Sequence, residues 1–250
     1  VQEIGKALDL IEYITGVFNL KLDEDYRYRL SLGNRSNTEK YYKNDEAWGK
    51  SEDLLRKLMQ KRGSNFEEAK DEAAFYGPKI DIQMKNVNGK EDTAFTVQYD
   101  FCMPGRFNLT YAGEDGKDHE CFVVHRSSIG AIERSIAFLI EKYAGAFPLW
   151  LSPVQVKVIP VRTAHNDYAK KVSEILKENN IRVELADEDE NLGSKVRGAK
   201  TEKIPYWIVI GDKEIEANKI TLESRDNGNL GQMEIETLVE KLLEEIKNKK

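Results

Sequence analysis

Residues 125–134 contain the residue types and spacing best suited to binding an anion. The segment reads HRSSIGAIER and joins a strand-like run to a helical pattern. Gly130 permits a ligand or another stretch of backbone to come close, and a helix N-terminus favours anionic groups. The guanidinium of Arg134 is permanently charged, and its planar, bidentate hydrogen-bonding geometry suits a phosphate. An ordinary strand–helix junction with a surface arginine has the same pattern, so spacing alone leaves both interpretations open.

A second candidate is a polar face on the strand predicted for residues 94–102. Strict alternation places Thr96, Gln98 and Asp100 on one side of this strand. The opposite side is apolar and consists of Phe95, Val97, Tyr99 and Phe101. An all-polar strand face is unusual unless it forms the floor of a water-filled cleft, although a solvated sheet face would have the same pattern.

The elements that would position these residues follow from hydrophobic periodicity. Apolar residues at helical spacing predict helices at residues 2–18 and 46–61, and alternation predicts a strand at residues 25–32. Strand-like runs at residues 80–84, 94–102, 107–112 and 120–125, with a hairpin turn at Asn88-Gly89, indicate an antiparallel meander. The helix that follows is expected to bury an apolar stripe: Ile129, Ile132, Ile136, Leu139 or Ile140, and Tyr143.

The second half of the chain alternates strands with helices. Strands are predicted at residues 154–159, 181–185, 206–210 and 220–222, and helices at 166–177, 192–203 and 235–246. Such alternation argues for a mostly parallel sheet covered by helices. Residues 206–210 read YWIVI, as expected of a central strand. A change of pattern between Leu149 and Pro153 predicts two domains, 1–152 and 153–250, in a fold of the α/β (α+β) class.

The composition indicates a globular chain with a strongly charged surface. Of the 250 residues, 40% are hydrophobic and 33% are charged; the net charge of −6 argues against a broad nucleic-acid-binding surface but not against a local basic patch. No apolar run approaches the roughly 18 residues of a membrane span. Cys102 and Cys121 form no CxxC motif, so we expect a reducing, cytoplasmic setting. A start at Val1 inside a helical pattern suggests a piece of a longer protein.

The segment at residues 125–134 resembles motif 3 of the class II aminoacyl-tRNA synthetases, with the His-Arg beginning of the threonyl-tRNA synthetases. Further blocks resemble that family, in the family's order, over nearly the whole chain. In the first half they are AFYGPKI at residues 74–80, TVQYDFCMPGR at 96–106 and YAGAFPLWLSPVQ at 143–155. In the second half they are NLGSKVR at residues 191–197, IPY at 204–206 and VIGDKE at 209–214.

The resemblance implies an incomplete class II antiparallel sheet with helices, lacking motifs 1 and 2, followed by an α/β anticodon-binding domain. The family attaches threonine to its tRNA through a threonyl-adenylate, using ATP and Mg²⁺. Arg134 matches the arginine that binds the ATP phosphate and the adenylate, and Gln98 lies on the strand under the adenylate. The other positions matched near the adenylate or the tRNA 3′ end are Tyr76, Lys79, Thr96 and Gly130. Three positions depart from the family's pattern, so the resemblance assigns them no ATP-binding role: Asp92, Thr93 and Phe95.

His125 matches one of three zinc ligands of the family, in which Zn²⁺ binds the amino and hydroxyl groups of threonine and so rejects valine. Without the resemblance, a histidine at a strand end is more often structural. Cys121 cannot share a metal with His125, because residues four apart on a strand are separated by about 13 Å. Neither His119 nor His165 stands at a position equivalent to another ligand. The resemblance therefore implies an incomplete zinc site in this chain.

In the second domain the resemblance implies contacts with the anticodon bases and phosphates of a threonine tRNA. The matching positions are Lys203 and Glu214, with Lys195 and Arg197 matched more loosely. Glu223 stands where bacterial relatives commonly have an arginine, which puts one base contact in doubt, and Arg225 is the candidate substitute. Each of these charged residues could also be ordinary solvated surface.

Three interpretations stay open from the sequence. The chain belongs to a threonyl enzyme and is catalytically incomplete by itself, or it is a non-catalytic tRNA-binding module built from the same domains. The third is a related class IIa enzyme such as the prolyl synthetase, against which the His125-Arg126 pair argues. The expected partners are threonine, ATP and threonine tRNA, contacted at its anticodon stem-loop and acceptor end. A homodimer is expected of the whole enzyme, and no membrane association is expected.

Overall fold

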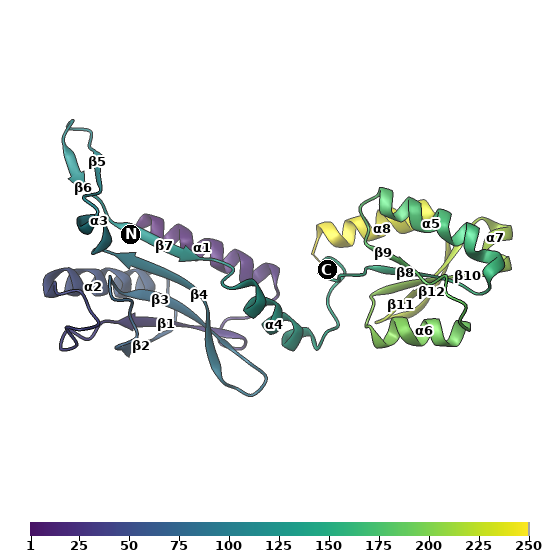
Figure 1. The fold of residues 1–250 in the computed structure, drawn as a ribbon, viewed down its shortest axis with the longest axis horizontal. Coiled ribbons are helices and arrows are strands. Elements are labelled where there is room, and N and C mark those ends of the chain that lie inside the picture. Colours follow the sequence, from purple (N-terminus) through teal and green to yellow (C-terminus); the bar gives the residue numbers. More distant parts are fainter. Residues whose placement is uncertain (250) are drawn as a thin grey trace. The chain divides into compact units, whose positions relative to one another are not determined.

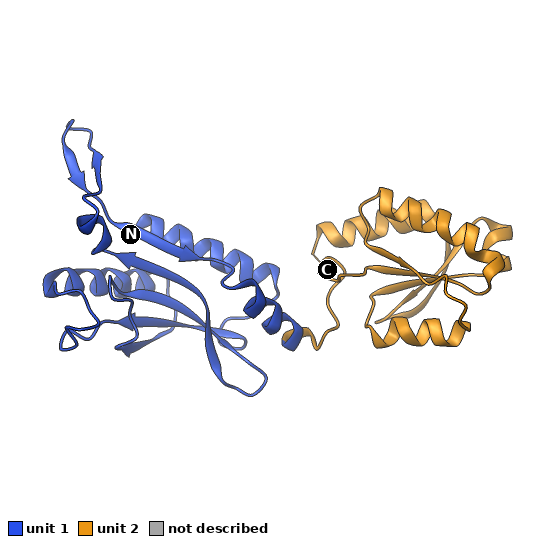
Figure 2. Cartoon of the chain, in the orientation of Figure 1, with its two compact units in different colours: residues 1–141 blue, residues 142–250 orange. Residues whose placement is uncertain are grey.

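The computed structural model describes residues 1–249. The chain divides into two compact units, Val1–Glu141 and Lys142–Lys250 (Figure 2). Residues 142–152, which the sequence assigned to the first domain, lie with unit 2, so the functional boundary after Ser152 stays a prediction. Within residues 1–249, no helix has the length and apolar character needed to cross a membrane.

Unit 1 is built on a five-stranded sheet in the order β2-β1-β3-β4-β7 (Figure 1). All neighbouring strands are antiparallel except β1 and β2, which are parallel. The strands are β1 (Tyr26–Leu32), β2 (Phe66–Lys70), β3 (Lys79–Lys85), β4 (Glu91–Asp100) and β7 (Val123–Ser127). The helices are α1 (Gln2–Val17), α2 (Asp45–Lys61), α3 (Met103–Arg106) and α4 (Ile132–Tyr143). The predicted helices at 2–18 and 46–61 and the strand at 25–32 are confirmed.

The core of unit 1 lies between the sheet and helices α1 and α2. Helix α1 buries Ile4, Leu8 and Ile11, which recur at helical spacing. These side chains pack against one face of the sheet, to which β1 contributes Tyr28 and Leu30. The alternate residues of the same strands therefore point to the other face of the sheet, which carries the polar side chains described below.

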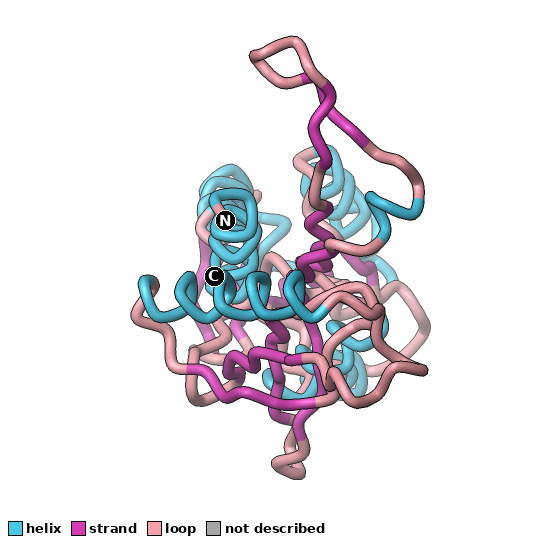
Figure 3. Tube along the Cα trace, turned by 90° about the vertical axis from the view of Figure 1, so that its left-hand side faces the viewer, coloured by secondary structure: helices cyan, strands magenta, loops and turns pink. Residues whose placement is uncertain are grey.

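The predicted meander is interrupted after β4. The short strands β5 (Thr110–Ala112) and β6 (Asp118–Glu120) pair only with each other, as a hairpin that projects from the sheet of unit 1 (Figures 1 and 3). The run predicted at residues 120–125 therefore belongs to two strands, β6 in the hairpin and β7 beside β4. Strand β6 pairs with β5, and after it the chain returns to the main sheet, where β7 pairs with β4.

The apolar stripe predicted for α4 is confirmed at Leu139 and wrong at its isoleucines. Helix α4 buries Ser135, Phe138 and Leu139, and Phe138 joins the core of unit 1. The four isoleucines of the expected stripe are instead about half exposed or more: Ile129, Ile132, Ile136 and Ile140. When a helix is apolar on two sides, hydrophobic periodicity does not predict which side packs against the sheet.

Unit 2 contains a five-stranded sheet in the order β12-β11-β10-β8-β9. The strands are β8 (Val156–Pro160), β9 (Val183–Leu185), β10 (Tyr206–Ile210), β11 (Ile220–Ser224) and β12 (Gly228–Met233). Strands β9, β8 and β10 are parallel, whereas β11 and β12 add in antiparallel fashion. The prediction of a mostly parallel sheet thus holds for the first three strands, and β10 is central as predicted.

Helices cover both faces of this second sheet. Helices α5 (Asn166–Glu178) and α8 (Ile235–Lys247) pack on one face, where Val172 and Leu238 meet Ile208. Helix α6 (Leu192–Thr201) packs on the other face, where Ala199 meets Trp207. The short helix α7 (Asp212–Ala217) follows β10 directly and places Glu214 at the end of that strand.

Candidate adenylate-binding face and anticodon-binding surface

Strand pairing assembles the polar face of unit 1 from four strands. In the registers of β1, β3, β4 and β7, one row runs through Ser31, Lys79, Gln98 and His125. The next row runs through Arg29, Asp81, Thr96 and Ser127. Residues predicted separately from three sequence blocks are therefore neighbours on one face of one sheet.

At one end of this face, His125 is paired with Asp100. The imidazole Nε2 lies 2.8 Å from Oδ2 of Asp100, whose side chain is fully buried. The other carboxylate oxygen of Asp100 accepts the backbone N–H groups of Cys102 and Met103, each at 2.9 Å. The sequence placed Asp100 on this face but gave it no role; its contact with His125 spans 25 residues of chain and depends on the β4–β7 register.

Tyr76 and Gln98 adjoin the His125–Asp100 pair. The Tyr76 hydroxyl donates to the side-chain oxygen of Gln98, and the Tyr76 ring centroid lies 5.2 Å from that of His125. Burial and the negative charge of Asp100 both raise the pKa of Tyr76, so the phenol remains a donor at neutral pH. The loop that carries Tyr76 fits against β4 because Gly77 has no side chain: a Cβ there would lie 1.8 Å from the Tyr99 carbonyl oxygen.

Lys79 is engaged by a buried carboxylate that the sequence analysis missed. Asp81 has no exposed side-chain surface and accepts from the Lys79 ammonium at 2.5 Å and the Arg29 guanidinium at 3.1 Å. The Ser31 hydroxyl also donates to it, at 2.7 Å. Lys79 must therefore leave Asp81 before it can contact a phosphate. An acidic residue between Ile80 and Ile82 was the available signal.

The motif at residues 125–134 is held against β4 by its glycine. Gly130 has a φ of +70°, and a Cβ at this position would lie 2.1 Å from the Ala94 carbonyl oxygen. The close approach expected at Gly130 is thus with the backbone of β4. Four residues later, Arg134 is exposed, and its guanidinium donates to the Thr93 carbonyl oxygen. A phosphate can therefore reach Arg134 without breaking an ion pair.

The described residues do not form a zinc site by themselves. Among residues 1–249, no group of three or more His, Cys, Asp and Glu side chains is placed to hold a metal ion, whereas a protein zinc site takes at least three such ligands. The thiol of Cys121 donates to the Leu109 carbonyl oxygen. His119 pairs with Asp115 in the exposed hairpin, and His165 is buried in unit 2. His125 therefore offers one ligand of an incomplete set.

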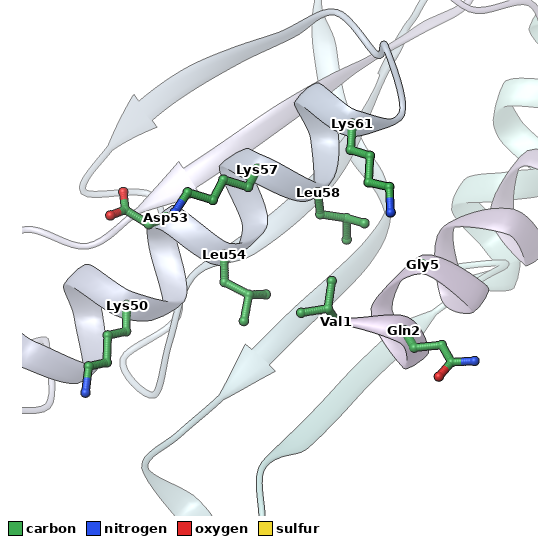
Figure 4. A pocket seen from close by; sticks show the side chains of 9 residues that line it. All are labelled: Val1, Gln2, Gly5, Lys50, Asp53, Leu54, Lys57, Leu58 and Lys61. Atoms are coloured by element: carbon green, nitrogen blue, oxygen red, sulfur yellow. The ribbon is translucent and has the colours of Figure 1, made fainter.

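A cavity of about 750 Å³ in unit 1 is separate from the polar face. It lies between the start of α1 and helix α2, where Leu54 and Leu58 point toward Val1 (Figure 4). Lysines line the same cavity: Lys50, Lys57 and Lys61. Because α1 and α2 cover the apolar face of the sheet, this cavity is not continuous with the row of Gln98 and His125.

In unit 2, the two candidates on α6 have different environments. Lys195 is buried, and its ammonium donates to the carbonyl oxygens of Ala186 at 2.8 Å and Pro160 at 3.4 Å. In this position Lys195 links α6 to the ends of β8 and β9, so the structure gives it a packing role rather than an RNA contact. Arg197, two residues along, is exposed.

Glu214 is a fixed acceptor at the start of α7. Its carboxylate accepts the Gly211 backbone N–H at 2.9 Å and the Thr221 hydroxyl at 2.7 Å. Burial tends to raise the pKa of Glu214, but these hydrogen bonds outweigh burial and lower it, so the group is charged at neutral pH. Thr221 stands two residues before Glu223 on β11, which puts both on the face that α6 partly covers.

Glu223 and Arg225 are both engaged within unit 2. The buried Trp207 donates its indole N–H to Glu223 at 3.1 Å. Arg225 donates to the carbonyl oxygens of Phe147 at 3.0 Å and Lys203 at 2.9 Å, and it pairs with Asp226. Arg225 thus holds two backbone segments together and is not available as a substitute for the missing arginine.

Lys203 lies at the other end of β10 from Glu214. It precedes the strand, and its ammonium donates to the Ala144 carbonyl oxygen. Since β10 has five residues, the two candidates are separated by at least about 13 Å along the strand. One nucleotide could therefore not contact both side chains, and their contacts with the anticodon stay a prediction.

Comparison with known proteins identifies both units. A model of the tRNA synthetase class II core domain (G, H, P, S and T) matches residues 7–143. The chain belongs to the class II aminoacyl-tRNA synthetase family. A second model, of the anticodon binding domain, matches residues 155–245, which lie in unit 2.

Curated proteins similar to this chain include threonine–tRNA ligases. The one from Clostridium botulinum strain Eklund 17B is 46% identical over 248 residues, which is 99% of this chain and 38% of the relative. The one from Oceanobacillus iheyensis is 43% identical over 250 residues, again 38% of its own length. This class II synthetase chain therefore spans about two fifths of the length of these relatives.

Solved structures agree with this assignment. The chain superposes with a TM-score of 0.88 on the RNA binding domain of threonyl-tRNA synthetase from Cryptosporidium parvum, at 28% identity, covering 97% of this chain and 60% of that one. A prolyl-tRNA synthetase from the same organism reaches a TM-score of 0.54 at 19% identity and covers 70% of this chain. The prolyl enzyme shares the fold alone, and over a smaller part of the chain.

Proposed function

We propose that this chain is the C-terminal part of a threonine–tRNA ligase. The observation that carries the proposal is the 46% identity to such a ligase over 99% of the chain. Unit 1 contributes one wall of the site where threonine and ATP, with Mg²⁺, form threonyl-adenylate. Unit 2 binds the anticodon of threonine tRNA. By family resemblance the whole enzyme acts as a homodimer in the cytoplasm.

The residues of unit 1 have complementary roles in adenylate formation. An oxygen of the threonine carboxylate bonds to the α-phosphorus of ATP, and the bond to the leaving pyrophosphate breaks. Arg134 stabilises the negative charge that develops on the phosphate. Gln98 and Tyr76 fix polar groups of the substrate beside Thr96. For zinc, this chain supplies only His125, so a zinc site requires side chains beyond residues 1–249.

The isolated chain is expected to be nearly inactive in threonine-dependent ATP–pyrophosphate exchange. Exchange needs cations around the phosphates and a complete threonine pocket, and the motif at residues 125–134 offers Arg134, whose partner is a backbone carbonyl and not a carboxylate. A chimera that joins the preceding part of the Clostridium botulinum relative to this chain should be more active by about 1,000-fold or more, because each lost charge contact costs about 100-fold.

Two outcomes of that comparison separate the candidate functions. Equal exchange rates for the isolated chain and the chimera would contradict the proposed incompleteness. An inactive chimera that still binds tRNA would favour the alternative, a non-catalytic tRNA-binding module.

The isolated chain is expected to discriminate anticodons. Hydrogen bonds from bases to a charged acceptor such as Glu214 contribute about 1.5–3 kcal/mol, so a changed anticodon base should weaken binding by about 10-fold or more. Affinities of transcripts that differ only in the anticodon measure this. Equal affinity for all transcripts would reject specific readout by unit 2.

Alanine substitutions of Arg197 and Lys195 on α6 should change different properties: tRNA binding for Arg197 and stability for Lys195. Arg197→Ala is expected to weaken tRNA binding and to reduce its salt dependence without changing thermal stability, because Arg197 is exposed. Lys195→Ala should lower the stability of unit 2 by about 2 kcal/mol, since it removes a packed side chain and leaves two buried carbonyl groups unpaired. Fluorescence-detected binding and thermal unfolding of both variants test this pair. A lower affinity of folded Lys195→Ala than of Arg197→Ala would contradict it.

A further inference from the structure

We propose that Asp100 is a positioning residue for His125: it holds the imidazole as the Nε2–H tautomer and leaves Nδ1 as the nitrogen that meets a ligand. The identity of that ligand rests on the proposed function. The tautomer itself does not, because it follows from contacts within unit 1.

The carboxylate of Asp100 is fixed in orientation by three contacts. Oδ1 accepts two backbone N–H groups, from Cys102 and Met103, each at 2.9 Å. Oδ2 lies 2.8 Å from Nε2 of His125. Asp100 is fully buried, so a rotation that lost any of these contacts would leave a buried polar group unsatisfied, at a cost in stability.

This arrangement decides where the proton of a neutral His125 resides. A carboxylate has acceptors and no donor, and a neutral imidazole has one donor and one acceptor nitrogen. The contact with Asp100 therefore requires the proton on Nε2. Nδ1 then carries the lone pair.

The rest of the environment keeps the ring in place and Nδ1 free. His125 pairs with Gln98 across β4 and β7, and the Tyr76 ring packs against the imidazole with centroids 5.2 Å apart. Nδ1 has no hydrogen-bond partner within the described range 1–249, and 45% of the side chain is exposed. A free imidazole lone pair backed by a carboxylate is suited to a divalent cation or to a hydrogen-bond donor such as an ammonium or hydroxyl group.

Asp100→Asn gives a sharp test because the asparagine has only one possible orientation. Its carbonyl oxygen must replace Oδ1 to accept the N–H groups of Cys102 and Met103. Its NH₂ group then faces His125 and donates, so Nε2 must become the acceptor. We expect the tautomer of His125 to invert, with the proton on Nδ1.

Nitrogen-15 NMR reads the tautomer directly, and the chain has only three histidines. In histidine-labelled chain at alkaline pH, we expect His125 to show a protonated Nε2 and an unprotonated Nδ1. His165 is an internal reference, because its Nδ1 accepts the Arg162 N–H at 3.2 Å and its Nε2 lies 3.0 Å from Asp212. Both histidines should therefore have the same type of spectrum in the wild-type chain.

The matched control is Asp115→Asn, at the exposed pair of Asp115 and His119 in the hairpin. This variant should leave the spectra of His125 and His165 unchanged. An unchanged His165 spectrum in Asp100→Asn shows that unit 2 is intact, and a preserved unfolding transition shows that unit 1 is folded.

Two results would overturn the inference. One is a wild-type His125 that is protonated on Nδ1 or that populates both tautomers equally. The other is a folded Asp100→Asn variant whose His125 tautomer is the same as in the wild type. Neither result depends on tRNA binding or on exchange activity, so failure of this inference and failure of the proposed function are distinguishable.

Discussion

Replacement of Gly130 by alanine is expected to destabilise unit 1 by about 3 kcal/mol or more. A Cβ at this position would lie 2.1 Å from the Ala94 carbonyl oxygen, so β4 or the motif must shift. Overpacking of this kind costs about 1–3 kcal/mol, and the left-handed conformation at a φ of +70° adds about 1–2 kcal/mol for an L-residue. Urea unfolding followed by hydrogen exchange of peptides from unit 1 measures the loss.

Gly89→Ala is the matched control for Gly130→Ala. Gly89 has a similar φ, +75°, but its Cβ would meet no atom within 4 Å. Only the conformational cost of about 1 kcal/mol is then expected. Peptides from unit 2 should be unaffected by either substitution. Equal losses for the two variants would show that the approach of Gly130 to Ala94 contributes nothing.

Arg134→Ala is expected to reduce kcat/KM for threonine-dependent ATP–pyrophosphate exchange by about 100-fold or more. The measurement uses the chimera with the preceding part of the Clostridium botulinum relative. The exposed guanidinium has a backbone carbonyl as its partner, so it can turn to the phosphate where charge develops. Arg134→Lys should recover only part of the activity, because an ammonium keeps the charge but lacks the planar, bidentate hydrogen-bonding geometry of a guanidinium.

Arg56→Ala controls for the loss of an arginine from unit 1. Arg56 lies on α2 and pairs with Glu68 and Asp53, away from the polar face. Its removal should change the exchange rate less than twofold and stability by less than about 1 kcal/mol. If Arg134→Ala were no more harmful than Arg56→Ala, Arg134 would not take part in adenylate formation.

Much of the local structure could be predicted because it depends on local patterns. Helices α1 and α2 have one apolar face each, and β10 is apolar throughout, so periodicity and composition were sufficient. The family assignment was also within reach of the sequence, since the matching blocks are contiguous. Helix α4 was predicted as an element but with the wrong buried side, because it is apolar on two sides.

The candidate site was predicted only in part. Alternation placed Thr96, Gln98 and Asp100 on one face, but it could not say that Asp100 meets His125 or that Lys79 is held by Asp81. Those contacts arise from strand register, which joins segments distant in the chain. Similarly, Lys195 and Arg197 are both cations of α6, and only the packing of that helix on β8 buries one and exposes the other.

The sequence by itself thus determined which elements form, where the two halves differ and to which family the chain belongs, because these depend on residue order and local periodicity. Tertiary structure alone decided which charged groups are available to a ligand. The physical reason is that burial and pairing are non-local: a lysine or a histidine nitrogen is free only if no other strand or helix brings an acceptor to it. In unit 1 that rule leaves Nδ1 of His125 free, and it gives Arg134 a backbone carbonyl as its partner, whereas Arg29 and Lys79 are paired with Asp81.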